Sequence, residues 1–285
     1  MYKSEADIAI ASIEAYLKSE AGRKKLAEEQ AAAKKKIEEE KKRLAEDQAK
    51  EKLKSLPSSI QRLLASFVYV KGGSFTMGCT SEQDNCDDDE KPSHKVTLSS
   101  FNMGKYEVNQ SQWQAVMGSH PSSFKGCGEC PVEQVSWNDI QEFIRKLQKL
   151  TGKRFRLPTE GEWEFAARGG TRSQGYKYAG SNSLGSVAWY EENSNDNTHP
   201  VGQKLPNELG LYDMTGNVWE WCNDLRGDYD KSPSTNPKGP SSGAIRVLRG
   251  GSFISSATNC RVAIRNHDVP SYRYNFMGFR VALSQ

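Results

Sequence analysis

Residues 210–221 read Gly-Leu-Tyr-Asp-Met-Thr-Gly-Asn-Val-Trp-Glu-Trp, and this stretch anchors the interpretation of the whole chain. Its second half, residues 217–221, alternates as a β-strand does. The chain before it, from residue 169 onward, is rich in Gly, Ser and Asn. Long loops of this kind need a scaffold that holds their ends, and they often carry function. The stretch therefore predicts a strand within a loop-rich globular domain.

Short helices and strands surround this stretch. Three helices are marked by capping residues: one follows Asn109 and ends at Gly118, one follows Ser136 and ends at Gly152, and one follows Thr159. Strands are expected at 68–70, 72–78, 94–98, 101–108, 244–249, 261–264 and 278–283. Small helices, many short strands and long loops together predict the α+β class.

The first part of the chain has a different composition. Residues 1–54 are mostly Ala, Glu and Lys, without Pro, which predicts a long helix. Its apolar stripe is sparse, so a solvated helix is favoured and a weak coiled coil is the alternative. Pro57 ends the helix. We therefore expect residues 1–66 to form a helical leader or stalk and residues 67–285 to form the globular domain.

Charge and hydropathy exclude some classes of function. The chain has 39 Lys and Arg against 36 Asp and Glu, a net charge of +3 over 285 residues. This balance argues against a broad nucleic-acid-binding surface, so we expect no nucleic-acid partner. No apolar run approaches the length of a membrane span.

Further motifs occur in order along residues 68–283. They are Gly-Gly-Ser-Phe-Thr-Met-Gly at 72–78, Tyr-Glu-Val-Asn at 106–109, Pro-Val-Glu-Gln-Val-Ser-Trp at 131–137, Arg-Leu-Pro-Thr-Glu-Gly-Glu-Trp-Glu at 156–164, Arg-Gly-Gly-Ser at 249–252 and Gly-Phe-Arg at 278–280. Together with residues 210–221, they resemble domains of the formylglycine-generating-enzyme, or sulfatase-modifying factor, type. The resemblance implies a C-type-lectin-like fold with short helices, short antiparallel strands and long loops.

The resemblance does not by itself imply activity. The enzymes of this family bind copper through two cysteines that lie five residues apart after the Gly-Gly-Ser turn. Cys260 falls at the second of these positions, and Ser255 falls at the first. A hydroxyl is a hard ligand that does not replace a thiolate in a Cu(I) site. We therefore expect a chain that is not an enzyme and requires no cofactor, with a formylglycine-generating-type oxidoreductase as the alternative.

The resemblance also implies a calcium site, which would be formed by Asp213, Gly216, Val218 and Glu220. Two carboxylates and two backbone carbonyls are oxygen ligands that suit Ca²⁺. The alternative is that Glu220 hydrogen-bonds buried loop amides. A second calcium signature, Trp-Asn-Asp at 137–139, is interpreted as a helix start instead.

The six cysteines favour disulfides. Cys79 and Cys86 flank a short loop, and Cys127 and Cys130 form a Cys-x-x-Cys motif whose alternative is half a zinc site. We expect each of these two pairs to be bonded. Cys222 and Cys260 are expected in the core, and whether they are neighbours or bonded stays open.

The region 246–280 has an unusual residue distribution. A frame of Arg, Gly, Cys and Pro alternates with residues that follow no hydrophobic period. Lys, Glu, Gln, Met and Trp are absent from residues 253–276, although Lys and Glu are abundant elsewhere. Mutated Asn codons of the AAC type cannot encode these five residues. The layout resembles the variable proteins of diversity-generating retroelements.

This resemblance implies a non-catalytic display protein with a diversified binding surface. Exposed Tyr, Ser and Asn suit such a surface, because Tyr offers contact area at low entropic cost. A plain family member with a structural role is a further alternative. The ligand-binding residues are expected to be Ile254, Ser255, Ser256, Thr258, Ile264, His267, Asp268, Val269, Ser271, Tyr272, Tyr274, Asn275 and Phe276, with Leu248 and Phe253 as lesser candidates.

The same interpretation predicts a location and a partner. Disulfides favour a place outside the cytoplasm, and we expect the surface of a bacterial cell. The partner would be a protein or another macromolecule of variable identity. Membrane association is expected only through a lipid-anchored precursor whose leader precedes residue 1.

Overall fold

The computed structural model describes residues 4–283 and divides the chain into two compact units, Met1–Leu56 and Pro57–Gln285. This division lies before the predicted boundary at residue 66, because the short helix α3 (Ser58–Ala65) belongs to the globular unit. Its side chains Ile60 and Leu63 are buried. None of the described helices is long and apolar enough to cross a lipid bilayer.

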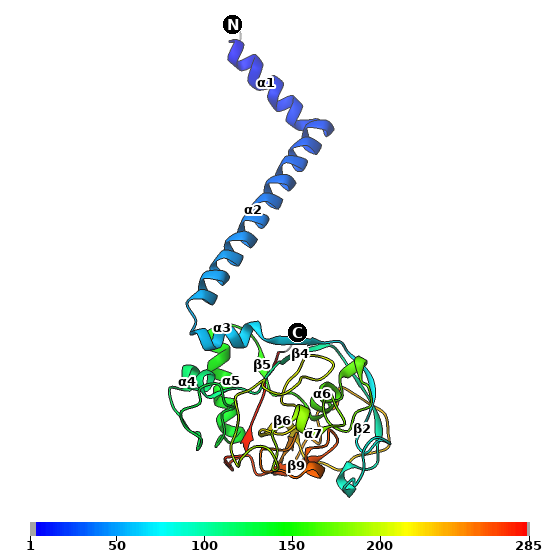
Figure 1. The fold of residues 1–285 in the computed structure, drawn as a ribbon. Coiled ribbons are helices and arrows are strands. Elements are labelled where there is room, and N and C mark those ends of the chain that lie inside the picture. The colour runs from blue at the N-terminus through cyan, green and yellow to red at the C-terminus, as the bar shows by residue number, and fades with distance from the viewer. Residues whose placement is uncertain (1–3, 284–285) are drawn as a thin grey trace. The chain divides into compact units, whose positions relative to one another are not determined.

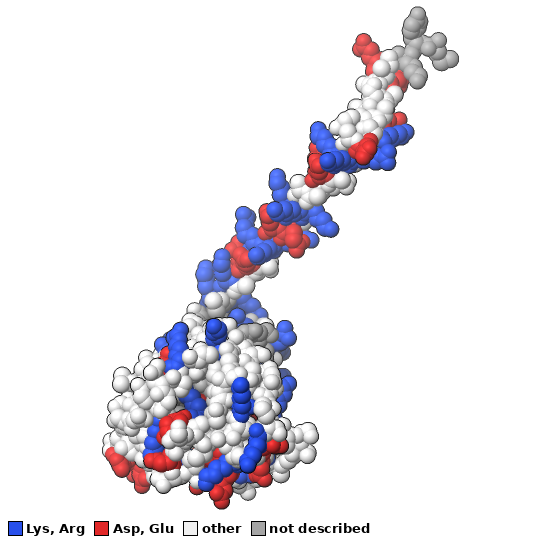
Figure 2. All heavy atoms as spheres, turned by 90° about the vertical axis from the view of Figure 1, so that its right-hand side faces the viewer, with Lys and Arg blue, Asp and Glu red and all other residues white. Residues whose placement is uncertain are grey.

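The first unit consists of two helices, α1 (Glu5–Lys18) and α2 (Glu20–Lys54). The sequence predicted one long helix, and the structure divides it at Ser19. The Ser19 amide donates to the carbonyls of Ala15 and Tyr16, while its side chain accepts from the Gly22 amide. A serine side chain competes with the helical backbone for hydrogen bonds, so one residue ends α1 and caps α2. Basic and acidic side chains alternate along α2 (Figure 2).

The globular unit contains three small sheets, in the orders β1-β4-β11-β5, β10-β6-β8-β9 and β2-β3-β7 (Figure 1). The strands are β1 (Phe67–Val70), β2 (Gly73–Met77), β3 (His94–Leu98), β4 (Phe101–Gly104), β5 (Phe155–Arg156), β6 (Trp219–Leu225), β7 (Ser234–Thr235), β8 (Arg246–Arg249), β9 (Arg265–Asp268), β10 (Met277–Gly278) and β11 (Ala282–Leu283). Most pairs are antiparallel, whereas β10 pairs with β6 and β3 pairs with β7 in parallel.

The predicted capping residues begin the three main helices, which are α4 (Gln110–Met117), α5 (Trp137–Thr151) and α6 (Glu160–Ala167). Asn109, Ser136 and Thr159 each accept a hydrogen bond from the third residue of the helix in a capping box. Gly118 and Gly152 end α4 and α5 in the left-handed conformation. Short helical turns complete the unit: η1 (Asp88–Glu90), η2 (Gly170–Arg172), α7 (Leu184–Val187) and η3 (Ala257–Cys260).

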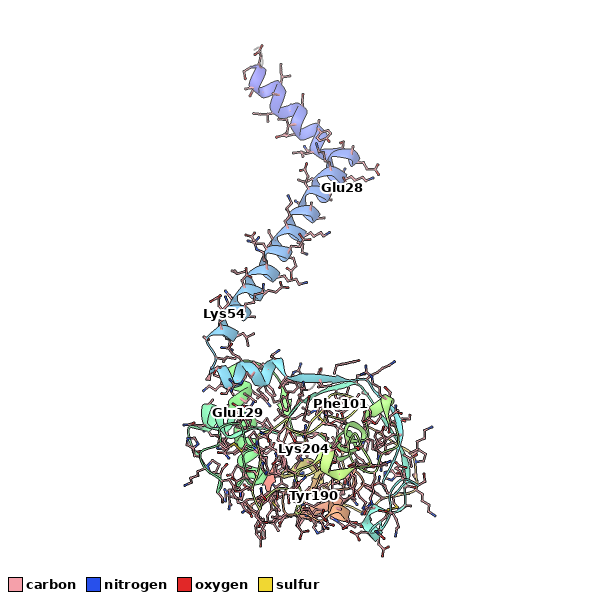
Figure 3. All side chains as sticks on the ribbon, viewed as in Figure 1. Glu28, Lys54, Phe101, Glu129, Tyr190 and Lys204 are labelled. Carbon is pink, nitrogen blue, oxygen red and sulfur yellow. A yellow bond between two sulfur atoms is a disulfide. The ribbon has the colours of Figure 1, made fainter. Side chains whose placement is uncertain are left out.

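The core of the globular unit lies around α6 and the strands beside it. Trp163 and Phe165 of α6 are almost fully buried, and Phe101 packs in the same cluster, where Figure 3 labels it. A separate smaller cluster gathers Tyr178 and Val187 with Cys260.

The strand predicted at 261–264 is not formed. These residues are buried, and the Ile264 amide closes a turn onto the Arg261 carbonyl (3.2 Å). Arg261 is held in this turn by both oxygens of Glu90, each at 2.6 Å. The strand begins one residue later, at Arg265, and pairs with β8.

Gly251 provides a test of the turn that precedes this region. It has a φ of +79°, and a Cβ there would lie 2.6 Å from the Asn259 carbonyl oxygen and 2.9 Å from Cys260 Sγ. Gly118 has a similar φ of +74°, but a Cβ would meet nothing within 4 Å. We expect Gly118→Ala to cost about 1 kcal/mol of unfolding free energy and Gly251→Ala more than about 3 kcal/mol. Denaturant unfolding followed by tryptophan fluorescence measures both, and equal costs would contradict this account.

Candidate ligand-binding surface

The predicted ligand-binding residues fall into three groups by exposure. The exposed residues are Ile254, Thr258, His267, Val269, Ser271, Tyr272 and Tyr274. The partly buried residues are Ser256, Asp268, Asn275 and Phe276. The buried residues are Leu248, Phe253, Ser255 and Ile264, whose side chains do not contribute to the exposed surface.

Most of the exposed residues follow β9, which is the edge strand of its sheet. β9 pairs with β8 through Val247 and His267, and β8 in turn pairs with β6. Within the globular unit, β9 lies at the end away from α3 and β4 (Figure 1). Tyr190, near this same end, is labelled in Figure 3. The candidate surface and the helix α3 are therefore at opposite ends of the globular unit.

The loop between β9 and β10 is fixed by backbone hydrogen bonds. The Tyr272 amide donates to the Val269 carbonyl (2.9 Å) and closes a turn around Pro270. The amide of Gln134 donates to the carbonyl of Tyr274 (3.0 Å), and the amide of Asn138 donates to the carbonyl of Pro270 (3.2 Å). Because these bonds involve main-chain atoms only, they hold the loop whatever its side chains are.

Three aromatic rings follow one another along this loop. Tyr272 and Tyr274 meet edge to face with ring centroids 6.2 Å apart. Tyr274 and Phe276 are stacked at 5.0 Å with an interplanar angle of 10°. Tyr272 is 49% exposed and Tyr274 is 39% exposed. The loop therefore presents an ordered aromatic surface to solvent.

The side chain of Arg273 attaches the loop to α5. Its guanidinium donates to both oxygens of Asp139, each at 2.7 Å. Partial burial opposes ionisation of Asp139, but the hydrogen bonds from Arg273 and Ser136 hold its pKa below the usual range. Asp139 was predicted only as part of a helix start, and Arg273 was not predicted as a site residue, because no local pattern in the sequence pairs residues so far apart.

A second group of predicted residues surrounds the turn at 253–258. Phe253 is buried and packs edge to face on Phe124, with centroids 5.2 Å apart. Its carbonyl accepts a hydrogen bond from Ser194 Oγ (2.8 Å). Ile254 beside it is 45% exposed. Phe253 thus forms the base of this turn, and Ile254 lies on its surface.

Ser255 and Cys260 occupy the positions that the resemblance gives to two copper-binding thiols. Ser255 is buried, and its Oγ lies 3.1 Å from Ser252 Oγ. Cys260 is also buried, with Sγ 4.0 Å from the Ser255 carbonyl oxygen. Burial raises the pKa of the Cys260 thiol to about 12. The pair therefore offers one protonated thiol and one hydroxyl.

Buried carboxylates lie around the predicted calcium residues. Glu220 accepts hydrogen bonds from Arg280 and from Trp163 Nε1 (2.7 Å), so its oxygens are occupied. Asp213 is different: Oδ2 accepts from the Gly202 amide (2.7 Å), while the buried Oδ1 has no hydrogen-bond partner among the described residues. Burial raises the pKa of Asp213 to about 6. An unpartnered oxygen of this kind fits a hard cation.

Glu107 is a buried carboxylate that the calcium prediction did not include. Burial and the charges of Asp213 and Glu220 raise its pKa well above the usual range. Its oxygens accept from the Val218 amide (3.2 Å) and the Asn217 side chain (2.7 Å). Between residues 4 and 283, no group of three or more His, Cys, Asp or Glu side chains is placed to hold a metal. A cation at Asp213 would therefore depend on backbone carbonyls, which the predicted Gly216 and Val218 would provide.

Both predicted disulfides are confirmed, between Cys79 and Cys86 and between Cys127 and Cys130. Cys222 and Cys260 are free and buried, and they belong to different clusters of the core. Burial raises the pKa of both thiols.

Comparisons with known proteins agree with this architecture. The family described as "Sulfatase-modifying factor enzyme 1-like domain" matches residues 53–285. The chain is 35% identical over 246 residues to the chaperone protein LppX of Paenibacillus barcinonensis, covering 69% of this chain and 81% of that protein. It is 37% identical over 192 residues to the formylglycine-generating enzyme of Streptomyces coelicolor, covering 61% of this chain and 59% of that enzyme.

A solved structure gives the same result for the fold. Treponema denticola variable protein 1 matches with a TM-score of 0.70 and 34% identity, covering 77% of this chain and 95% of that chain. The predicted α+β fold of the C-type-lectin-like, formylglycine-generating-enzyme type is confirmed, as is the likeness to a variable protein.

Alkylation tests the state of the cysteines. At about pH 7.5, where a buried thiol of raised pKa carries almost no thiolate, we expect the native chain without reductant to take up no iodoacetamide. In guanidinium it should take up two labels, at Cys222 and Cys260, and after reduction all 6 cysteines should react. Intact-mass spectrometry counts the labels. Rapid labelling of Cys260 in the native chain would contradict its burial.

Proposed function

The chain belongs to the family of sulfatase-modifying factor enzyme 1-like domains, and we propose that it is a non-catalytic display protein that binds a macromolecular ligand. The binding surface is formed by the loop at 269–276 and by the exposed residues of β9 and the turn at 253–258. The identity of the ligand varies with the side chains that this surface carries.

The stacked aromatic rings on a fixed backbone are the observation that carries this proposal. Tyr and Phe supply contact area at low cost in side-chain entropy, and such residues dominate the energy of binding interfaces. Soluble proteins rarely leave neighbouring large aromatics exposed without a use for them. The likeness to a variable protein of Treponema denticola supports the same role.

The donor atoms around the Gly-Gly-Ser turn favour binding over oxidation chemistry. A thiol with a pKa of about 12 ionises poorly at neutral pH, and Ser255 brings no thiolate to a soft copper ion. The alternative, a formylglycine-generating-type oxidoreductase, would need Cys260 to act without the second thiol. The other alternative, a purely structural role, leaves the exposed aromatic rings without a purpose.

We also propose display outside the cytoplasm, on a bacterial cell surface. The two disulfides support this location, since such bonds persist in oxidising compartments. The charged helices of the first unit suit a solvated stalk, because none of their described apolar side chains is buried. The face of the globular unit in Figure 2 carries both charge signs, which suits a protein partner better than a nucleic acid.

Replacing two exposed tyrosines separates binding from stability. Phage-displayed peptides selected on the parent chain provide the probe, since such peptides collect at surfaces with aromatic anchors. In Tyr272→Ser/Tyr274→Ser, the selected peptides should bind at least about 100-fold more weakly, which corresponds to about 2.7 kcal/mol. The melting temperature should fall by less than about 4 °C, because exposed substitutions cost about 0.5 kcal/mol each.

Tyr69→Ser is the matched control, because Tyr69 is 59% exposed on β1, outside the proposed surface. It should leave peptide binding unchanged. Equal binding to the double variant and to the parent would refute the proposed surface. Copper-dependent conversion of a cysteine peptide into an aldehyde by the parent would refute the non-catalytic role.

We propose further that Ca²⁺ binds at Asp213 with the backbone carbonyls of Gly216 and Val218. Glu220, the fourth predicted member, is left out of this set because its oxygens already accept from Arg280 and Trp163. A ligand that binds only the folded chain stabilises it, by about 2.7 kcal/mol at a hundred times Kd. The melting temperature should therefore be higher in CaCl₂ than in EGTA. Asp213→Asn keeps the left-handed backbone, for which φ is +54°, and should abolish the difference.

Exposed Asp196→Asn is the control for loss of a carboxylate and should keep the calcium effect. Mg²⁺ should not replace Ca²⁺, since it requires a tighter octahedral site. Identical melting temperatures of the parent in CaCl₂ and in EGTA would refute the calcium site.

A further inference from the structure

A cavity of about 440 Å³ lies outside the surface described above, between α6, the end of β6 and the chain at 227–240. Its volume is in the range of small-molecule sites, roughly 300–1,000 Å³. Asp224, Glu160 and Arg265 line it together with Met77, Pro237 and Pro240. It therefore combines apolar walls with a few buried charged groups.

Asp224 is the group in this cavity whose bonding is incomplete. Its side chain is buried, with 3% of the residue exposed. Oδ2 accepts a hydrogen bond from the Glu160 amide (3.0 Å). Within residues 4–283, no donor is hydrogen-bonded to Oδ1, and no Lys or Arg forms an ion pair with this carboxylate. The charge of Arg246 favours the ionised form of Asp224, but burial and the charges of Glu160 and Glu162 outweigh it. The buried carboxylate is therefore costly to keep ionised.

The neighbouring carboxylate is fully compensated. Glu160 accepts from Arg265 at both oxygens, at 2.7 and 3.0 Å, and from the Tyr229 hydroxyl at 3.2 Å. The remaining donors of Arg265 reach the carbonyls of Asp89 (2.8 Å) and Gly227 (3.0 Å). The positive charge of Arg265 is thus already committed to Glu160, and it does not neutralise Asp224.

The cavity contains a second unpartnered polar atom and has charged groups at its exposed edge. Ser234 lines the cavity, and its Oγ is buried without a hydrogen-bond partner among the described residues. Asp228 and Asp230 lie at the exposed rim. Pro237 and Met77 provide an apolar wall beside Gly161, where a Cβ would meet Pro237 Cγ at 3.3 Å. Lys238 also lines the cavity, and Asp228 is paired with Arg226 (3.5 Å), so the charge that favours a cation is that of the buried Asp224. This carboxylate together with the apolar wall matches a cationic head on a short alkyl stem.

We propose that this cavity is a binding site for a small organic cation, an alkylammonium or alkylguanidinium group, that pairs with Asp224 and hydrogen-bonds Ser234. The nitrogen donors of such a group supply the hydrogen bonds that Asp224 and Ser234 lack. The alkyl stem packs on Pro237 and Met77. This site is separate from the loop at 269–276, and its failure would leave the proposed display function untouched.

Calorimetric titration of the full chain tests the proposal. The probes are n-butylguanidinium and n-butylammonium, with n-butylurea and n-butanol as uncharged analogues of similar shape. At about pH 8.5, where Asp224 is mostly ionised, we expect the cations to bind with Kd values in the millimolar range. The uncharged analogues should show no binding. Binding of both kinds with equal affinity would overturn the assignment as a cation site, as would no binding of any probe.

Asp224→Asn keeps an oxygen that can accept from the Glu160 amide and removes only the charge. Cation affinity should fall at least tenfold in this variant. Exposed Asp196→Asn makes the same charge change elsewhere and should bind as the parent does. Should Asp224→Asn fail to fold, Ser234→Val decides the matter, since it adds bulk to the cavity and should also weaken binding at least tenfold. Unchanged affinity in either folded variant would overturn the proposal.

The pH dependence of binding gives an independent readout. Burial and the charge of Glu160 raise the pKa of Asp224 to about 8. A cation requires the carboxylate, so affinity for n-butylguanidinium should rise from about pH 7 to about pH 9 and then level off. The other charged or titratable groups that face Asp224 or the cavity are Glu160, Glu162, Arg246, His94, Tyr229, Asp228, Asp230, Lys238 and Arg265. A flat profile in the parent over this interval would overturn the role of Asp224.

Discussion

Buried arginine–glutamate pairs hold residues 249–280 in place, and the rest of the globular unit depends on them. The pairs are Arg249 with Glu164, Arg261 with Glu90, Arg265 with Glu160 and Arg280 with Glu220. An unpaired charge in the interior costs several kcal/mol, so each arginine side chain must lie beside its glutamate. The backbone is therefore fixed at these four points. The exposed residues between them carry no such constraint, and their side chains are free to differ.

The difference between local and distant contacts explains which features could be predicted from the sequence. Helix starts are local signals: Asn109, Ser136 and Thr159 cap helices a few residues away, and all three were identified. The pair of Arg249 with Glu164 joins residues 85 positions apart. No spacing rule in a single sequence identifies such a partner. The division of the first helix at Ser19 was missed because its surroundings are strong helix formers.

For the candidate surface too, the local sequence pattern indicated an exposed loop but did not separate exposed from buried positions within it. The exposed tyrosines at 272 and 274 lie where the lack of a hydrophobic period indicated an exposed loop. Leu248, Phe253, Ser255 and Ile264 were included in the same list but are buried. Leu248 lies in β8, which is paired on both sides by β6 and β9. The other three lie in successive turns, which send side chains inward at irregular intervals. The inward and outward positions of such turns therefore cannot be separated by periodicity.

The main-chain hydrogen bonds that hold the loop at 269–276 have a kinetic consequence. The amides of Gln134 and Asn138 fix this loop before any ligand arrives. Ordering a flexible loop during association slows the encounter and costs about 0.5–1.5 kcal/mol for each side chain immobilised. A loop that is already ordered avoids most of this delay. Different side chains on it would then give ligand complexes that form at similar rates and differ mainly in how long they last.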